Sequence, residues 1–264
     1  MSPYKRSTKP NLGYVMRGVF PFSVDRIFTA GEPGLWLDPS DLTTLFQDSA
    51  GTTPVTAAGQ PVGRVLDKSG NGNHATQATA GSRPTYQVDA SGRGYLSFDG
   101  VDDSLRTPTI TPGTDKAQMF AGVRKLSDAA TGIIAEHGIG GNYGVRISSS
   151  GAPTFAAVSR GTVAITAQSA SAYAAPVSAV VTGLGDISGD LAAVRTNGVQ
   201  VTNNGDQGTL GNYAASPIYI GRRGGTTLPF NGRVYGLIAR FGAALSGQQI
   251  TLAERWLNAK TGAF

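Results

Sequence analysis

Two short polar runs constrain the fold of this chain more than any other feature. Residues 67–74 (DKSGNGNH) form a tight turn signal, in which glycines supply positive φ angles and Ser and Asn side chains bond the backbone. Residues 95–103 (YLSFDGVDD) read as an alternating strand that ends in an acidic corner. Together they predict an antiparallel β-sandwich with a decorated rim, which can bind a glycan or a metal or only turn the chain.

The composition supports this all-β prediction. Glycine accounts for 37 of the 264 residues, about twice its usual share, and charged residues make up only 15%. Many turns and few charges fit a β-rich chain better than a helical one. The absence of cysteine excludes disulfides, thiolate nucleophiles and every cysteine-based metal site.

Short strand signals recur about every ten residues from Leu35 onward, the spacing typical of a sandwich. The expected strands cover residues 35–37, 62–66, 95–98, 117–126, 132–136, 143–148, 154–159, 162–168, 177–182, 191–196, 199–202, 217–220 and 233–241. Asn197-Gly198 predicts a type I′ hairpin turn, because both central residues need positive φ. The alternation of 233–241 is imperfect, which suggests a central strand.

One helix is expected, at the C-terminal end. Ser246 is a suitable N-cap, and Gln249 three residues later completes a capping box. Ile250, Ala253, Trp256 and Leu257 share one face, and Gly262 is a suitable stop. We expect this helix to cover apolar surface of the sandwich.

Charge patterning argues against nucleic acid as a partner. The net charge is +5, of which +3 lies in residues 1–34. Arg222-Arg223 forms a basic tip that can contact an acidic partner, but no face combines many basic residues with interleaved aromatics. No run of 18 apolar residues predicts a membrane span, and no apolar stretch after the basic N-terminus predicts a secretory signal.

Residues 1–34 read as an extended N-terminal arm, separate from a domain at 35–264. The segment contains four prolines and a later apolar, aromatic cluster. One interpretation is an anchor that docks on another protein; the other is an additional strand and loop on the chain's own domain. The residues expected to dock are Lys5, Arg6, Lys9, Arg17, Phe20, Phe22, Arg26 and Phe28.

The order of several motifs carries a resemblance to a known family. These motifs are LWLDPSDL at 35–42, the polar turn at 67–75, LSFDGVDD at 96–103, NGRVYGL at 231–237 and the helix at 245–257. The chain resembles laminin-G-like or concanavalin-A-like jelly-roll domains, in the form found in structural proteins of tailed bacteriophages. The resemblance covers residues 35–257 and implies a two-sheet jelly roll whose loops bind sugar or calcium.

Enzymatic chemistry is not expected. The chain has three glutamates, Glu32, Glu136 and Glu254, which lie far apart, and no strand carries the alternating carboxylates of a glucanase. Neither His74 nor His137 has a nucleophile elbow nearby. No cofactor is required in this interpretation.

Calcium and glycan sites remain open alternatives. Asp67, Asn71 and Asn73 from one loop, and Asp99, Asp102 and Asp103 from another, offer oxygens of the kind that Ca2+ prefers, although they can equally bond their own loops. Tyr143, Tyr173 and Tyr213 lie near small residues and can stack on a sugar, or can be buried.

These observations and the resemblance predict a non-enzymatic accessory protein of a tailed-phage virion. It would be a capsid decoration or a neck, collar or tail component, assembled in the host cytoplasm and anchored by its arm to capsid, neck or tail proteins. The alternative is an adsorption module that binds a host surface glycan. A homo-oligomer is expected, because repeated copies multiply weak contacts.

Overall fold

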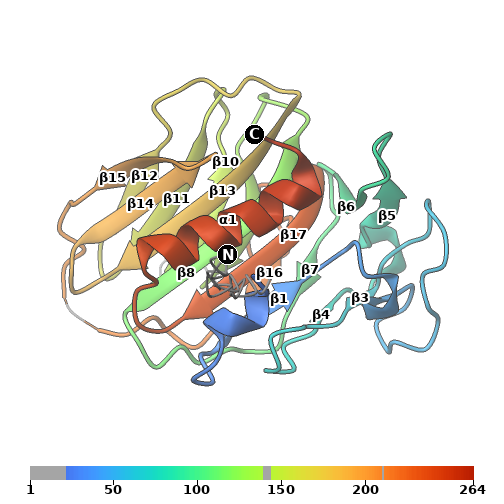
Figure 1. Cartoon of the computed structure of the whole chain (residues 1–264), viewed down its shortest axis with the longest axis horizontal. Coiled ribbons are helices and arrows are strands. Elements are labelled where there is room, and N and C mark those ends of the chain that lie inside the picture. Colours follow the sequence, from blue (N-terminus) through green and yellow to red (C-terminus); the bar gives the residue numbers. More distant parts are fainter. Residues whose placement is uncertain (1–21, 139–143, 210) are drawn as a thin grey trace, which may run out of the picture.

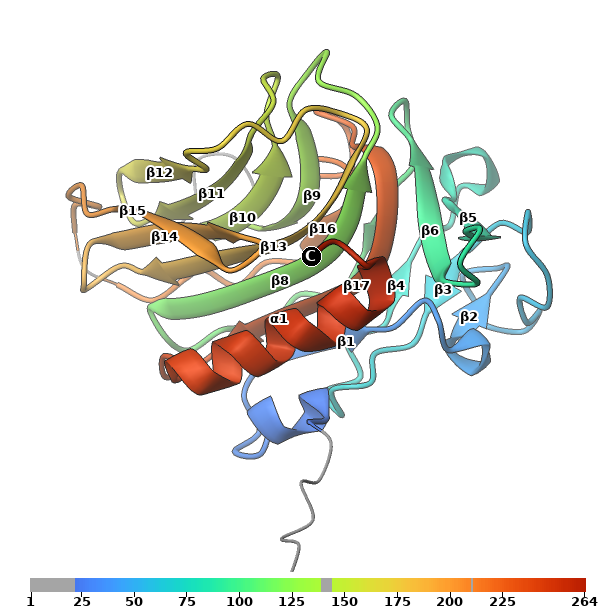
Figure 2. The same cartoon turned by 45° about the horizontal axis from the view of Figure 1, so that its top comes forward.

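Two antiparallel sheets stacked face to face form the computed structural model, which describes residues 22–138, 144–209 and 211–264 (Figures 1 and 2). The strands of sheet A run in the order β15-β14-β13-β8-β17-β6-β5, with β1 also paired to β17. Their bounds are β1 Gly34–Leu37, β5 Thr85–Val88, β6 Gly94–Asp99, β8 Lys116–Lys125, β13 Val177–Asp186, β14 Leu191–Thr196, β15 Val199–Asn203 and β17 Asn231–Phe241.

Sheet B contains the remaining strands, in the order β12-β11-β10-β9-β16-β7-β4-β3-β2. Their bounds are β2 Leu45–Phe46, β3 Arg64–Val65, β4 Ala75–Thr76, β7 Leu105–Arg106, β9 Gly132–His137, β10 Gly144–Ser149, β11 Phe155–Arg160, β12 Ala164–Gln168 and β16 Ile218–Ile220. The short 3-10 turns are η1 Val24–Ile27, η2 Leu42–Thr44 and η3 Ala80–Ser82. The predicted two-sheet sandwich is confirmed.

The inner faces of the two sheets meet in a continuous apolar core. Phe155 and Ile147 of sheet B and Val181, Leu237 and Phe241 of sheet A all belong to it and are at most 1% exposed. Because successive side chains alternate across a strand, each strand that lines this core presents its other side chains outward. Both sheets therefore have an outer face, and the two outer faces differ in what covers them.

The C-terminal helix α1, Gly247–Thr261, covers the outer face of sheet A (Figure 1). The predicted capping box is confirmed, since Ser246 accepts from the Gln249 backbone while the Gln249 side chain accepts from Ser246. Gly262 ends the helix in the left-handed conformation. Gly122 and Gly236 are paired beneath α1, where a Cβ on Gly122 would lie 2.6 Å from Thr261. These glycines let the helix approach the sheet closely.

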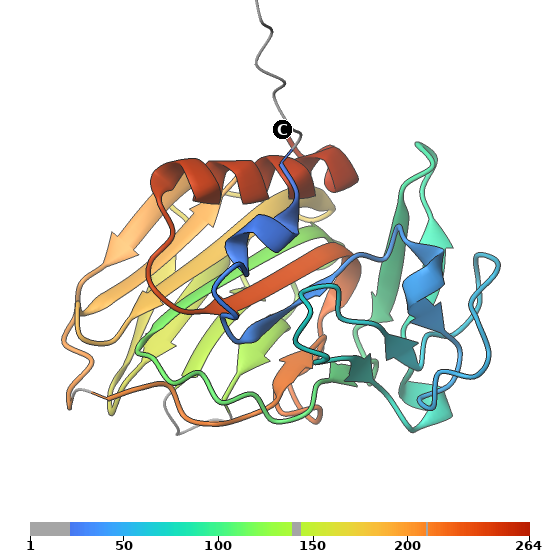
Figure 3. The ribbon, with the colours of Figure 1, turned by 60° about the horizontal axis from the view of Figure 1, so that its bottom comes forward.

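Residues 22–34 pack on the chain's own domain, as Figure 3 shows for η1 beside α1. Val24, Ile27 and Phe28 are buried with Leu257 in a second apolar cluster between the helix and sheet A. The expectation that the arm extends to residue 34 and docks on another protein through Phe28 is thus wrong for this part, because burial in the intramolecular cluster leaves Phe28 only 8% exposed.

The expected strands occur with shifts of at most two residues at their ends, except that β13 continues four residues beyond 182, to Asp186. The Asn197-Gly198 hairpin joins β14 to β15, and both residues have positive φ. β17 is central, paired with β8, β6 and β1. The three 3-10 turns and the short strands β2, β4, β5 and β7 were not predicted, because segments of two to four residues show little periodicity. Among the described residues, none of the helices has the length and hydropathy needed to cross a membrane.

Candidate functional site: a cleft on the open face of sheet B

One cross-strand row of side chains spans the outer face of sheet B. Residues paired directly across neighbouring strands project to the same face, so the strand register defines the row. Its members, from β2 to β12, are Phe46, Arg64, Thr76, Arg106, Tyr219, Glu136, Arg146, Val158 and Thr166. The row brings together residues from distant parts of the chain, and among the described residues no helix covers it.

A cleft of about 660 Å³ lies over one half of this row. Its walls include Arg64, His74, Gln77, Arg106 and Tyr219, together with Gly224 and Gly225 of the loop after β16. This volume is within the range of about 300–1,000 Å³ typical of small-molecule sites. Among the described residues that line it there is no carboxylate, so the two arginines make the cleft positive.

The polar turn at 67–74 forms one wall of the cleft through Gly72 and His74. The Asp67 backbone N–H donates to His74 Nδ1 at 3.0 Å, so the neutral imidazole carries its proton on Nε2. The Nε2–H group of His74 is therefore available to donate a hydrogen bond to a ligand in the cleft. The turn that dominates the sequence analysis therefore orients a hydrogen-bond donor in this site.

Arg106 and Tyr219 meet on the other wall. The Arg106 guanidinium carbon lies 6.0 Å from the centre of the Tyr219 ring, and the Arg106 side chain is exposed. Gln77 donates to the Ser104 carbonyl at 3.0 Å and accepts from the Thr79 backbone, which holds its amide in place. An aromatic ring beside fixed polar groups is suited to binding a sugar, which offers both hydroxyls and an apolar face.

The predicted calcium ligands of the polar turn serve the fold. Each Asp67 carboxylate oxygen accepts two hydrogen bonds. Oδ1 accepts from the Trp36 and Ser69 backbone N–H groups, and Oδ2 accepts from the Ser69 hydroxyl and the Asn73 backbone N–H. The Asn73 amide donates to the Gly34 carbonyl at 2.7 Å, and the Asn71 amide to the Glu32 carbonyl at 3.0 Å. These bonds engage the carboxylate and tie the turn to β1, and calcium binding at this turn stays a prediction.

The second predicted set of calcium ligands does come together. One carboxylate oxygen from each of Asp99, Asp102 and Asp103 lies within 4.8 Å of the others, at the turn after β6. Asp102 accepts from the Ser82 hydroxyl at 2.8 Å, and Asp103 accepts from the Asp99 backbone at 3.0 Å. Burial and the charges of Asp99 and Asp102 raise the pKa of Asp103 to about 6, against the opposing hydrogen bond.

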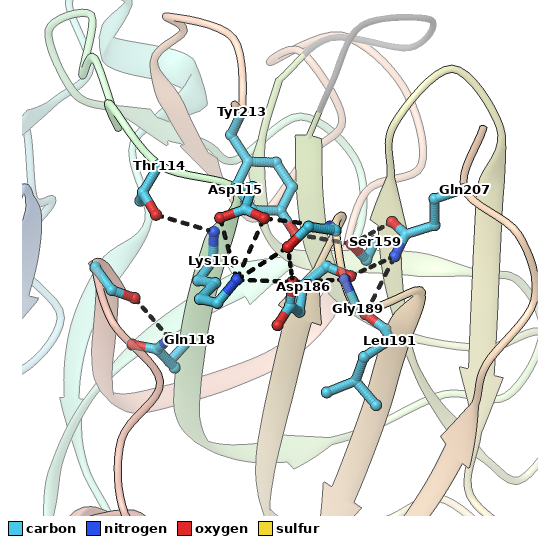
Figure 4. Close-up of polar contacts among 12 residues, drawn as sticks. Thr114, Asp115, Lys116, Gln118, Ser159, Asp186, Gly189, Leu191, Gln207 and Tyr213 are labelled. Carbon is cyan, nitrogen blue, oxygen red and sulfur yellow. Dashed lines mark hydrogen bonds and ion pairs between the residues drawn. The ribbon is translucent and has the colours of Figure 1, made fainter. Parts of the chain in front are cut away.

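The two predicted sugar-stacking tyrosines that the structure describes, Tyr173 and Tyr213, pack within the domain. Tyr213 is 3% exposed, and its hydroxyl lies 2.7 Å from Ser159 Oγ within a buried polar network that also includes Gln207 (Figure 4). Tyr173 packs against Phe155, with 5.9 Å between ring centres. The prediction is wrong for Tyr213, since its ring lies between the sheets. Tyr143 lies outside the described residues.

The expected docking residues of the arm fall into two groups. Lys5, Arg6, Lys9, Arg17 and Phe20 lie outside the described residues. Of the others, Phe22 is partly buried against the apolar cluster under α1, Arg26 is exposed, and Phe28 is buried.

Beyond Tyr219 the same face carries a second charged group. Glu136 on β9 is 4% exposed, and its Oε2 lies 3.9 Å from an Arg146 nitrogen and 3.5 Å from Arg223 Nε. Burial raises the pKa of Glu136, and the two arginines oppose this only in part. Arg64, His74, Arg106 and Tyr219 were not predicted as a set, since only the strand register places them side by side.

No protein-family model matches the chain, and no curated protein matches it in sequence. Solved structures with the same fold include an arabinofuranosidase complexed with arabinofuranosyl-alpha-1,2-xylobiose (14% identity, TM-score 0.61, 89% of this chain and 64% of that one). Another comes from work on botulinum neurotoxin type C, whose cell entry depends on two ganglioside molecules (12% identity, TM-score 0.57, 86% of this chain and 51% of that one). A third is the binding domain of botulinum neurotoxin DC in complex with SialylT (11% identity, TM-score 0.57, 86% of this chain and 52% of that one).

The chain spans about half the length of the two toxin structures and under two thirds of the arabinofuranosidase. At these identities the likeness establishes the fold, a lectin-like jelly-roll β-sandwich, which is the fold class that the sequence predicts.

Proposed function

We propose that this protein is a carbohydrate-binding module and that the cleft over β3, β4, β7 and β16 is its binding site. The observation that carries the proposal is the meeting of Tyr219, His74, Arg64 and Arg106 around one cleft of oligosaccharide size. Tyr219, which is 8% exposed, forms part of the cleft wall, and the surrounding donors match sugar hydroxyls. The solved structures of the same fold include an arabinofuranosidase complexed with an oligosaccharide and a neurotoxin whose cell entry depends on gangliosides, which supports this direction.

The test fills the cleft without touching the core. Thr76 lies between Arg64 and Arg106 in the row and is half-buried, so Thr76→Trp places an indole where the sugar would lie. A glycan array probed with the full chain should give binders, and Thr76→Trp should weaken the best of them at least about tenfold, a loss of 1.4 kcal/mol. Thr202→Trp, on the exposed edge strand β15, is the matched control and should bind normally.

Two results would contradict the proposal: no glycan bound by a folded protein, or equal weakening by both tryptophan variants. Because the described lining residues include no carboxylate, binding should also survive EDTA. Loss of binding in EDTA would shift attention to the acidic turn at Asp99–Asp103.

The module is proposed to act without catalysis. A hydrolase of this type needs two carboxylates facing each other across a cleft. Glu254 is bonded to Arg195 under α1, Glu32 is bonded to Arg240, and Glu136 lies between two arginines on the other sheet. These three glutamates are thus engaged separately, which supports a binding role.

Residence on a tailed-phage virion is proposed from the sequence resemblance. In this proposal the segment that attaches to capsid, neck or tail proteins is shortened to residues 1–21, since residues 22–34 belong to the folded domain. Deleting residues 1–21 should abolish incorporation into particles assembled in the host cytoplasm while leaving the domain folded. Particles that still incorporate the truncated protein would contradict this location.

A further inference from the structure

The outer face of sheet B carries an unusual concentration of arginines that are incompletely bonded. We define the arginine tract as Arg64, Arg106, Arg146, Arg160, Arg222 and Arg223. Four are on strands with outward-facing side chains, and Arg222 and Arg223 are on the loop after β16. Glu136 is the one carboxylate among the described members of the cross-strand row.

Hydrogen bonding on this face is incomplete. The Nε atoms of five tract arginines are buried without a hydrogen-bond partner, and so are both carboxylate oxygens of Glu136; the five arginines are Arg64, Arg146, Arg160, Arg222 and Arg223. Buried polar groups in native proteins are bonded in the large majority of cases, and unbonded ones need an explanation. The Nε atoms themselves are inaccessible, but the Arg146 and Arg223 side chains are 25% and 34% exposed, so an acceptor from outside would meet their outer guanidinium nitrogens.

Charge repulsion within the tract points the same way. Burial, and then the charge of Arg223, lower the pKa of Arg146; Glu136 opposes this effect and Arg160 adds to it. Glu136 thus lies beside two guanidiniums, those of Arg146 and Arg223, and one carboxylate cannot neutralise both. An additional anion would relieve this repulsion, and the planar guanidinium fork suits carboxylate, sulfate and phosphate groups.

The tract continues the cleft. Tyr219 lines the cleft and pairs across the sheet with Glu136, and Gly224 of the cleft wall directly follows Arg223. At about 4.8 Å per strand, Arg64 and Arg106 are about 10 Å apart along the row, and Arg106 and Arg146 about 14 Å. A polymer lying across these strands would meet a cation at each of these intervals.

We propose that the ligand of this face is an anionic polysaccharide, which fills the cleft with one sugar unit and places acidic groups along the arginine tract. The proposal rests on the proposed carbohydrate-binding function and adds the charge of the ligand and its direction across the strands. The shared chemistry is a repeating acidic group, carried by a uronic carboxylate or by a sulfate ester.

The experiment compares three probes with the full chain: polygalacturonate, dextran sulfate and neutral dextran. At least one acidic polymer should bind, more weakly as salt is raised, and dextran should not bind at the same sugar concentration. Binding of only one acidic polymer supports the proposal and identifies the acidic group.

Single substitutions then locate the contact. Arg106→Gln and Arg146→Gln should each weaken binding about tenfold, the loss of one charge-assisted hydrogen bond. Arg255→Gln is the matched control, because it removes the same charge from the exposed side of α1, over the other sheet. Glu136→Gln should strengthen binding, since it removes the carboxylate from the tract.

Three results would overturn the proposal. In the first, dextran binds as tightly as the acidic polymers. In the second, Arg255→Gln weakens binding as much as the tract variants. In the third, a thymidine 30-mer binds as tightly as the acidic polysaccharides, which would make the ligand any polyanion. Neutral-glycan binding that is blocked by Thr76→Trp would still uphold the proposed function, so the two proposals fail separately.

Discussion

The outer faces of the two sheets use the same residue types in opposite ways. Under α1, the Arg195 guanidinium donates to both Glu254 carboxylate oxygens, at 2.7 and 3.0 Å. Nearby, Arg240 donates to Glu32 and Gln118, each at 2.7 Å, and to the backbone carbonyls of Ile27 and Ala243. On sheet B, Glu136 lies between Arg146 and Arg223 without a hydrogen bond.

This difference separates a structural face from a binding face. Buried charges stabilise a fold only when hydrogen bonds satisfy them, which is the case for Arg195 and Arg240. Charges left incompletely bonded cost stability, and proteins retain such groups at sites that serve a ligand. We therefore expect the stability of the protein to depend much more on the buried glutamate of the covered face than on that of the open face.

The largest loss of stability is expected from a substitution on the covered face. Glu254 is 2% exposed and also accepts from the Thr182 hydroxyl at 2.9 Å. Glu254→Gln should lower the free energy of unfolding by about 3 kcal/mol, because it leaves the Arg195 charge largely buried without its counter-charge. Urea unfolding followed by circular dichroism measures this loss.

The matched variant on the open face is Glu136→Gln. Glu136 is as buried as Glu254, but neither oxygen is bonded and burial raises its pKa, so its charge is disfavoured on balance. The change in unfolding free energy should stay below about 1 kcal/mol at pH 7. Equal losses from both variants would remove the distinction between the faces.

A pH-dependent effect, small over most of its range, comes from His137, the neighbour of Glu136 on β9, which points inward. Its ring is 1% exposed, with its centre 4.5 Å from that of Phe241, and burial lowers its pKa to about 4 despite opposing bonds to the Ile110 and Ser216 carbonyls. Between pH 6.5 and 4 the unfolded chain therefore binds a proton that the folded chain does not. Stability should fall as pH decreases through this window, by up to about 3 kcal/mol at its lower end and by less over most of it.

Unfolding free energies measured at pH steps from 7 to 4 test this expectation. Titrating carboxylates add a background slope, so the relevant quantity is the difference between the wild type and His137→Gln. The variant should lack the His137 contribution and show a flatter profile in this window. Identical slopes would mean that His137 is not the acid-sensitive group.

Much of the fold follows from local sequence signals. The capping box at Ser246, the left-handed stop at Gly262 and the Asn197-Gly198 hairpin were all predictable, because caps and tight turns depend on neighbouring residues. The strands β2, β4 and β7 were not, since two residues carry no period. Tyr213 was misplaced for a related reason: a tyrosine between small residues looks the same in sequence whether it is buried or exposed.

The site shows where local information ends. The turn at 67–74 was recognised as special, but its role as the support of His74 depends on a bond from the Asp67 backbone to His74 Nδ1. The arginines of β3, β7 and β10 are up to 82 residues apart in the chain and share a face only through the strand register. A register shift of one residue would send each of them into the core.

The all-β class, the helix and its limits, and most strand positions follow from local sequence, since these depend on periodicity and on residues within a few positions of one another. The packing of residues 22–34 on the domain, the covering of one sheet face but not the other, and the meeting of particular polar residues arise only in the folded chain. Those properties depend on pairing between distant strands, and the free energy of that pairing is not a property of any single segment.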